Sequence, residues 1–147
     1  MWDNILNIRQ NIFNTNTKNM AILPAKNLFL DSQSAQQDNK NILVLMHLQE
    51  CPWCHFVIDE VIADMAQMPE YTDKLIIRQI KINAGLEMID FAGQSIENNT
   101  FAKHQKIDFY PTVLLFNPQG QLLEKTIGVA NEDFYWSELD KTLEKHY

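Results

Sequence analysis

ILVLMHLQECPWC, residues 42–54, joins an apolar run directly to the only two cysteines of the chain. Residues 42–48 are apolar apart from His47, a pattern typical of a strand that is buried on both faces of a sheet. From Cys54 onward, apolar side chains recur at spacings of four and three until Pro69 ends the helical pattern. The sequence thus predicts a strand, a cysteine motif and a helix in immediate succession.

The two cysteines, Cys51 and Cys54, are separated only by Pro52 and Trp53. Because the chain has no other cysteine, they form a self-contained pair for two-electron redox chemistry. A helix N-terminus stabilises a thiolate through its unpaired N–H groups and its positive dipole end, so Cys51 is the expected nucleophile. Cys54, one turn further on, is expected to resolve a mixed disulfide formed at Cys51. Pro52 suits the first helical turn, where its missing N–H would be unpaired anyway.

A structural zinc site is the main alternative interpretation of the cysteine pair. Zinc needs two more ligands, and His47 and His55 are near in sequence, but strand alternation predicts that His47 is separated from the helix start. We therefore expect no metal and no cofactor beyond a redox-active Cys51–Cys54 disulfide. His55 is either a cation that favours the thiolate or a solvated residue on the first turn. Trp53 is expected to contact partner proteins, with packing against the helix stem as the alternative.

Composition predicts one globular domain over residues 1–147, since 46% of the residues are hydrophobic and 21% are charged. The net charge is -7 and the 12 basic residues are scattered, which argues against a nucleic-acid partner. No stretch approaches the roughly 20 apolar residues that a membrane span needs. The start of the chain lacks a charged region followed by an apolar block, although a secretory signal is removed from mature proteins. The compartment therefore stays open at this point.

Before the apolar run, two segments carry weaker signals. Trp2, Ile5, Ile8 and Ile12 recur at helical spacing and predict a short amphipathic helix. Residues 31–41 are polar, which indicates a surface loop or the end of a helix.

After the first helix, further elements follow in the order strand, helix, strand, strand, helix. Residues 75–82 predict a strand parallel to the first, because the helix between them makes a crossover connection. Residues 83–98 are polar and contain two glycines, so they indicate an irregular insertion, with a short helix as an option, before a helix over 100–106. The remaining predictions are strands at 112–116 and 121–128, a turn at 117–120 between them, and a final helix capped by Asn131.

Strand, Cys-x-x-Cys, helix, strand, helix and then Tyr110-Pro111-Thr112 before a hairpin and a last helix resemble the thioredoxin superfamily. The resemblance covers about residues 40–146 and leaves 1–39 as an N-terminal extension. It implies a three-layer α/β/α sandwich with a central mixed sheet of four to five strands, and an insertion before the third core helix. The Cys-Pro-aromatic-Cys motif looks most like exported thioredoxin-like proteins of bacterial sulfur-oxidation systems. That likeness implies a periplasmic location after signal removal, with the cytoplasm as the alternative.

The resemblance also implies a site and an activity. In the family the proline before the third core strand is cis and faces the cysteine pair, a role that passes here to Pro111. A proline at a strand start leaves neighbouring backbone groups free, so Tyr110, Pro111 and Thr112 are expected to bind an extended substrate segment. The implied function is a monomeric thiol–disulfide oxidoreductase that reduces disulfides in protein partners and is itself restored by an upstream thiol reductant. The alternatives are a disulfide oxidase or isomerase, and a non-catalytic binding module.

Two residues depart from the family pattern. Ordinary thioredoxins have Trp immediately before the first cysteine, where this chain has Glu50. They also bury an aspartate six residues before that cysteine as the proton acceptor for the resolving thiol, where this chain has Leu45. Glu50, Glu60 or water are the candidates for that role, and Glu50 and His55 are the candidate modulators of the cysteine pair.

Overall fold

The computed structural model describes residues 21–83 and 85–147, and the helix expected around Trp2–Ile12 lies outside them. A five-stranded sheet occupies the centre, with strands in the order β1-β3-β2-β6-β7. β1, β3 and β2 are mutually parallel, whereas β6 runs antiparallel to β2 and β7 antiparallel to β6. The predicted mixed sheet is confirmed. Its strands are β1 (Leu23–Pro24), β2 (Asn41–Leu48), β3 (Leu75–Ile82), β6 (Thr112–Phe116) and β7 (Leu122–Ile127).

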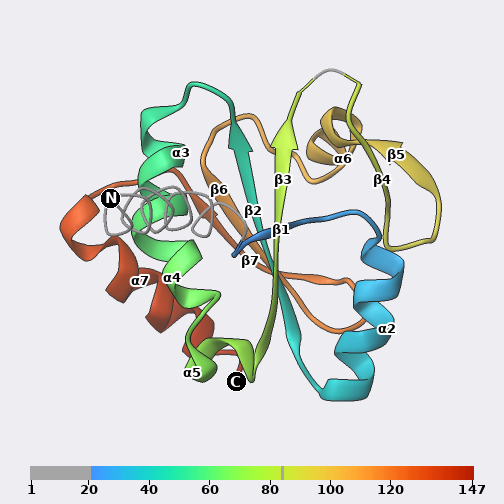
Figure 1. Cartoon of the computed structure of the whole chain (residues 1–147), viewed down its shortest axis with the longest axis horizontal. Helices are drawn as coiled ribbons and strands as arrows, with labels where there is room; N and C mark the ends of the chain where they lie inside the picture. Colours follow the sequence, from blue (N-terminus) through green and yellow to red (C-terminus); the bar gives the residue numbers. More distant parts are fainter. Residues whose placement is uncertain (1–20, 84) are drawn as a thin grey trace, which may run out of the picture.

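Helices cover both faces of this sheet, which confirms the three-layer α/β/α sandwich (Figure 1). One face carries the segment from α3 to α5 together with the C-terminal helix, and the other face carries α2 and α6. The first set comprises α3 (Pro52–Val57), the π-helical turn η1 (Ile58–Ile62), α4 (Ala63–Met65), α5 (Pro69–Thr72) and α7 (Glu132–Glu144). The second set comprises α2 (Leu28–Asp38) and α6 (Asn98–His104).

β2 is the central strand and is buried on both faces, as its apolar run predicts. Alternation along the strand sends Leu43 and Leu45 into the core under α3 and α7. Ile42, Val44 and Met46 point to the opposite face and enter the core under α2 and α6. β2 pairs in register with β3 on one side and β6 on the other, so it fixes the relative positions of the other strands.

The helix after the cysteine motif begins at Pro52 and contains one wide turn that its periodicity does not predict. In η1 the N–H of Ala63 donates to the carbonyl of Ile58, five residues earlier. The buried pair Val57 and Ile58 is accordingly followed by the buried pair Ile62 and Ala63 at a spacing of five. The extra residue keeps both halves of the helix in contact with the sheet.

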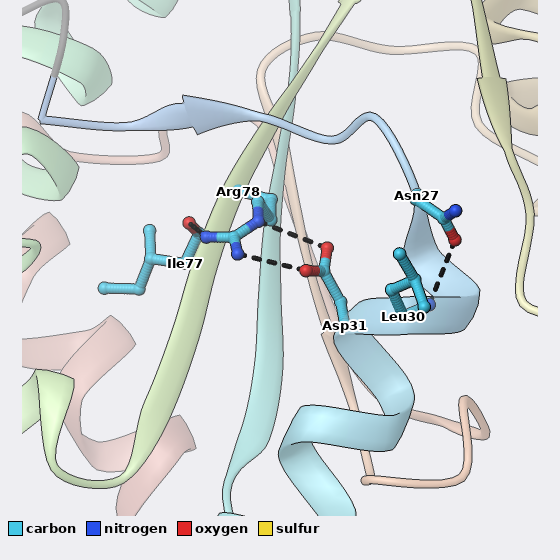
Figure 2. Close-up of polar contacts among 5 residues, drawn as sticks. All are labelled: Asn27, Leu30, Asp31, Ile77 and Arg78. Atoms are coloured by element: carbon cyan, nitrogen blue, oxygen red, sulfur yellow. Dashed lines mark hydrogen bonds and ion pairs between the residues drawn. The ribbon is translucent and has the colours of Figure 1, made fainter.

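Residues 31–38 form most of α2, so of the two options that the sequence left open they are the end of a helix and not a surface loop. Asn27 caps this helix by accepting the N–H of Leu30 at 3.0 Å (Figure 2). The helix ends at Asn39, which adopts a left-handed conformation with φ 53°. Besides Leu28, only Ser32 and Ala35 are buried on this helix. Such small or polar residues give little apolar periodicity, which is why the sequence did not distinguish a helix end from a loop.

The insertion expected to be irregular over 83–98 is a small hairpin. Its strands β4 (Glu87–Ile89) and β5 (Ser95–Glu97) pair antiparallel as a separate two-stranded sheet. Asp90 shapes the turn, because its carboxylate accepts the N–H groups of Ala92 and Gln94, both at 2.9 Å. The following helix, α6, begins two residues before the expected boundary.

The C-terminal part follows the prediction closely. β6 and β7 form the expected hairpin, and Asn131 caps α7 by accepting the N–H of Asp133 at 2.9 Å.

None of the helices in residues 21–83 and 85–147 has the length and apolar character needed to cross a membrane.

An ion pair fastens α2 to the sheet. The guanidinium of Arg78 on β3 donates two hydrogen bonds to the Asp31 carboxylate, at 3.0 and 3.1 Å (Figure 2). The two side chains are only 23% and 14% exposed, respectively, so water screens this pair less than a surface pair. The two-pronged geometry fixes the orientation of both groups.

Asp31→Asn is therefore expected to lower the free energy of unfolding by about 1–2 kcal/mol, because it removes the charge that Arg78 faces. Urea denaturation followed by circular dichroism measures the loss. Asp38→Asn is the matched control, since Asp38 is exposed on the same helix. Equal stability of the two variants would show that the ion pair contributes nothing measurable.

Candidate active site

Cys51 lies at the N-terminus of α3, as the sequence predicts. It has an extended backbone, with φ -114° and ψ 105°, and acts as the N-cap residue. Its sulfur accepts the N–H of Cys54 at 3.2 Å, in the place where a serine or aspartate oxygen usually accepts. Pro52 is the first helical residue, so no N–H is lost from the cap. The sulfur of Cys51 thus receives both a hydrogen bond and the positive end of the helix dipole.

Cys51 and Cys54 form a disulfide, with their Cα atoms 5.1 Å apart. The two sulfur positions differ in access, because Cys54 is 1% exposed whereas Cys51 is partly exposed. Cys54 begins the buried face of α3, which continues with Val57. An external thiol or disulfide therefore reaches Cys51 before Cys54.

Trp53 projects beside the disulfide and is 49% exposed. Its ring contacts Phe56 edge-on, with centroids 6.0 Å apart, and Phe56 contacts Tyr135 of α7 in the same manner at 6.2 Å. These contacts fix the indole while leaving half of it in solvent. One side of the indole thus packs on the helix stem, as the alternative interpretation expected, and the other side is exposed; contact with a partner protein stays a prediction.

The Tyr110–Pro111 peptide bond is cis, as the resemblance implies. β2 pairs with β6 up to Met46 and Thr112, so Pro111 and the cysteine motif lie at the same end of neighbouring strands. The Pro111 carbonyl accepts the N–H of Gly128 at 2.8 Å. Within residues 21–83 and 85–147, no hydrogen bond engages the backbone of Tyr110. Its groups are available to an extended segment.

Thr112 and Phe109 shape this loop from opposite sides. Thr112 is 1% exposed, and its hydroxyl donates to the Phe109 carbonyl at 2.7 Å, so it holds the loop together from inside. A direct contact between Thr112 and a substrate stays a prediction. Phe109 is 59% exposed and covers Gly128, whose φ is +67°. Sequence patterns gave no signal for Phe109, because its exposure depends on the non-local approach of Gly128.

His47 occupies a different face from the one that alternation was expected to give it. The α3 segment covers the face of β2 that bears Leu43 and Leu45, and His47 continues that face. Its ring Nε2 lies 2.8 Å from Oε1 of Gln79 on β3. Burial is the main cause that lowers the pKa of His47. The strand and the helix therefore enclose a polar group next to the cysteine motif.

The other charged candidates lie at the surface. Glu50 is exposed and has φ +57°, which turns the chain sharply between β2 and the cysteine motif. His55 on α3 and Glu60 on η1 are also exposed. Leu45 is fully buried, whereas the carboxylates of Glu50 and Glu60 are exposed, so neither lies in the interior beside Leu45. Among the residues that the structure describes, no three His, Cys, Asp or Glu side chains group as a metal site.

Gly128→Ala tests the packing of the loop. The added Cβ would lie 2.8 Å from Cε1 of Phe109, so the ring must move. The left-handed backbone of the alanine costs about 1–2 kcal/mol more. We expect a total loss of about 2–4 kcal/mol in unfolding free energy, measured in urea. Gly85→Ala is the control, since φ there is +82° and no atom lies within 4 Å of the added Cβ. Equal losses would show that Phe109 does not pack tightly there.

Comparisons with known proteins agree with this geometry. Solved structures with a similar fold include thioredoxin NaTrxh from Nicotiana alata, which is 27% identical with a TM-score of 0.52 and 80% of this chain and 82% of that chain covered. Thioredoxin O2 from Arabidopsis thaliana is 16% identical with a TM-score of 0.55, and 86% and 95% of the two chains are covered. A DsbH oxidoreductase is 15% identical with a TM-score of 0.60, and 84% and 85% are covered.

The comparison with curated protein sequences gave no match. The family model of the thioredoxin-like domain, however, matches residues 28–143, which include the cysteine motif, the cis proline and all of the central sheet except β1. This chain therefore belongs to the thioredoxin-like domain family.

Proposed function

We propose that this protein is a thiol–disulfide oxidoreductase that reduces disulfides in protein partners. The observation that carries the proposal is the unequal placement of the two cysteines. Cys51 caps a helix at the surface, where its thiolate is stabilised, and Cys54 lies buried one turn behind it. A nucleophile and a resolving thiol require this difference in access.

In the reduced protein, the Cys51 thiolate attacks one sulfur of a substrate disulfide. The substrate S–S bond breaks, a Cys51–substrate disulfide forms, and the first substrate thiolate leaves and takes up a proton. The Cys54 thiolate then attacks the Cys51 sulfur, which releases the second substrate thiolate and closes the Cys51–Cys54 disulfide. Two electrons have passed to the substrate. An external thiol reductant restores them to the protein.

Two features support a protein substrate bound in an extended conformation. The backbone of Tyr110 has no hydrogen bond to the described residues and lies at the same sheet end as Cys51. Two exposed apolar side chains at this end of the sheet, Trp53 on α3 and Phe109 on the loop before Pro111, offer contact area of low selectivity. Backbone pairing with such contacts favours accessible disulfides over a particular sequence. Support for the reducing direction comes from the likeness to the thioredoxin NaTrxh.

After reduction, Cys51 is expected to react with iodoacetamide much faster than Cys54 at pH 7. Exposure and the helix N-terminus both favour the Cys51 thiolate, whereas Cys54 is 1% exposed. A short alkylation pulse followed by peptide mass spectrometry measures the two rates. Comparable modification of both cysteines would contradict the assignment of nucleophile and resolving thiol.

Cys51→Ser is expected to abolish reduction of insulin disulfides by this protein, and Cys54→Ser is expected to accumulate a covalent Cys51–insulin complex, because resolution is removed. The paired variants are matched controls for each other, and the assay is run with a chelator present to exclude bound metal. Reduction that survives in Cys51→Ser would contradict the mechanism. A redox potential above about -150 mV would instead assign the protein to the disulfide oxidases.

A further inference from the structure

The proposed reduction cycle requires Cys54 to lose a proton inside the protein. Cys54 must become a thiolate before it attacks the mixed disulfide, and a buried thiol ionises reluctantly. Leu45, on the strand beneath, cannot accept a proton, and both Glu50 and Glu60 are exposed. A buried group that is not yet part of the cycle lies near this place.

That group is His47. It is 8% exposed and shares the face of β2 that bears Leu45, which packs in one core with Val57 and Val61 of the helical segment. Because β2 and β3 are parallel, the segment between them returns across the sheet, and its first turn lies over the carboxyl end of β2 (Figure 1). Cys54 is in that first turn, and His47 is the last residue of β2 on that face.

The pairing with β6 places His47 next to the substrate loop as well. The register runs from Ile42 opposite Phe116 to Met46 opposite Thr112. His47 is the next residue of β2 after that last pair and Pro111 is the residue before β6, so both lie at the same end of the sheet. The His47 side chain is thus on the helix-covered face, at the end of the sheet that carries both the cysteine motif and the cis-proline loop.

Gln79 determines which nitrogen of the ring can accept a proton. The amide nitrogen of Gln79 donates to the carbonyl of Ile22, so its oxygen faces His47. An amide oxygen only accepts, and the Nε2 of His47 must therefore carry the hydrogen. In the neutral ring, Nδ1 then holds the lone pair. The polar pair thus fixes the tautomer in which Nδ1 is the nitrogen that can take up a proton.

The surroundings keep this ring neutral near pH 7. Burial lowers the pKa of His47 most strongly, and the positive charges of Lys81 on β3 and His55 on α3 lower it further. The hydrogen bond with Gln79 and an interaction with the backbone of Leu48 act in the opposite direction.

We propose that His47, held by Gln79, accepts the proton of Cys54 during resolution of the mixed disulfide. The proton passes from the Cys54 sulfur to Nδ1, the thiolate attacks the Cys51 sulfur, and the Cys51–substrate bond breaks. The departing substrate thiolate takes up the proton of the imidazolium, directly or through a water molecule, which returns His47 to its neutral form. No electrons beyond those of the disulfide exchange are involved.

The test uses the aromatic disulfide DTNB with the reduced full chain in a stopped-flow spectrometer. Attack by Cys51 releases the first thionitrobenzoate, and resolution by Cys54 releases the second. His47→Gln is expected to leave the first phase unchanged and to slow the second by about 100-fold at pH 7, the lower limit for a positioned proton acceptor. The second phase of this variant should then rise about tenfold per pH unit, as the thiol ionises unaided.

Gln79→Glu provides a readout that a purely structural role would not move. A carboxylate beside the ring raises the pKa of His47, so the pH below which the second phase slows should shift upward. His104→Gln is the matched control, because His104 is exposed on α6. Superimposable second-phase pH profiles for wild type and His47→Gln, or no shift with Gln79→Glu, would overturn the proposal. Failure of the proposed oxidoreductase function would give a different result from failure of the His47 proposal, because the wild type would then lack the first phase, the attack of Cys51 on DTNB.

Discussion

The helix start at Cys51 is the constraint on which the rest of the site depends. A sulfur in the capping position is held by the N–H of Cys54 and lies at the positive end of the helix dipole. The chain reaches this geometry through Glu50, whose left-handed backbone costs about 1–2 kcal/mol. The packing of β2 and α3 offsets that cost, since every residue of β2 from Ile42 to Met46 is fully buried.

The two faces of the sheet contribute differently to the site. The face under α2 and α6 is apolar along β2, and α2 is fastened at its margin by Asp31 and Arg78. Along β2, the face under α3 and α7 is apolar at Leu43 and Leu45 and becomes polar at His47, which contacts Gln79. The buried His47–Gln79 pair thus lies at the end of the sheet that carries the cysteine motif, and the low-dielectric core beneath strengthens this polar interaction.

Local signals predicted the parts of this fold that local forces determine. The run 42–48 and the cap at Asn131 were recognised because burial and capping leave direct marks in the sequence. For α2 the sequence left a helix end and a surface loop as alternatives, because the buried face of that helix includes Ser32 and Ala35. The β4–β5 hairpin was not predicted, because each strand has only three residues. Non-local pairing determines such elements.

The role of His47 illustrates the same limit within the site. Alternation shows that His47 lies on the same face as Leu45, but not which face the following helix covers. That choice depends on the handedness of the crossover from β2 to β3, which involves residues about 30 positions away. Gln79 and Gly128 were likewise unrecognisable as site residues, because strand pairing and loop contact bring them there. Cys51 and Cys54 were recognisable because their chemistry lies in their spacing.

The wide turn at Ile58–Ile62 allows the helix to differ in length by one residue without disturbing either end. Residues before it stay aligned with the cysteine motif, and residues after it stay aligned with the sheet. A homologue with a regular helix here would carry a deletion inside this turn rather than in a loop. Alignment methods that avoid gaps in helices would then shift one half of the helix by a position and pair non-equivalent buried residues.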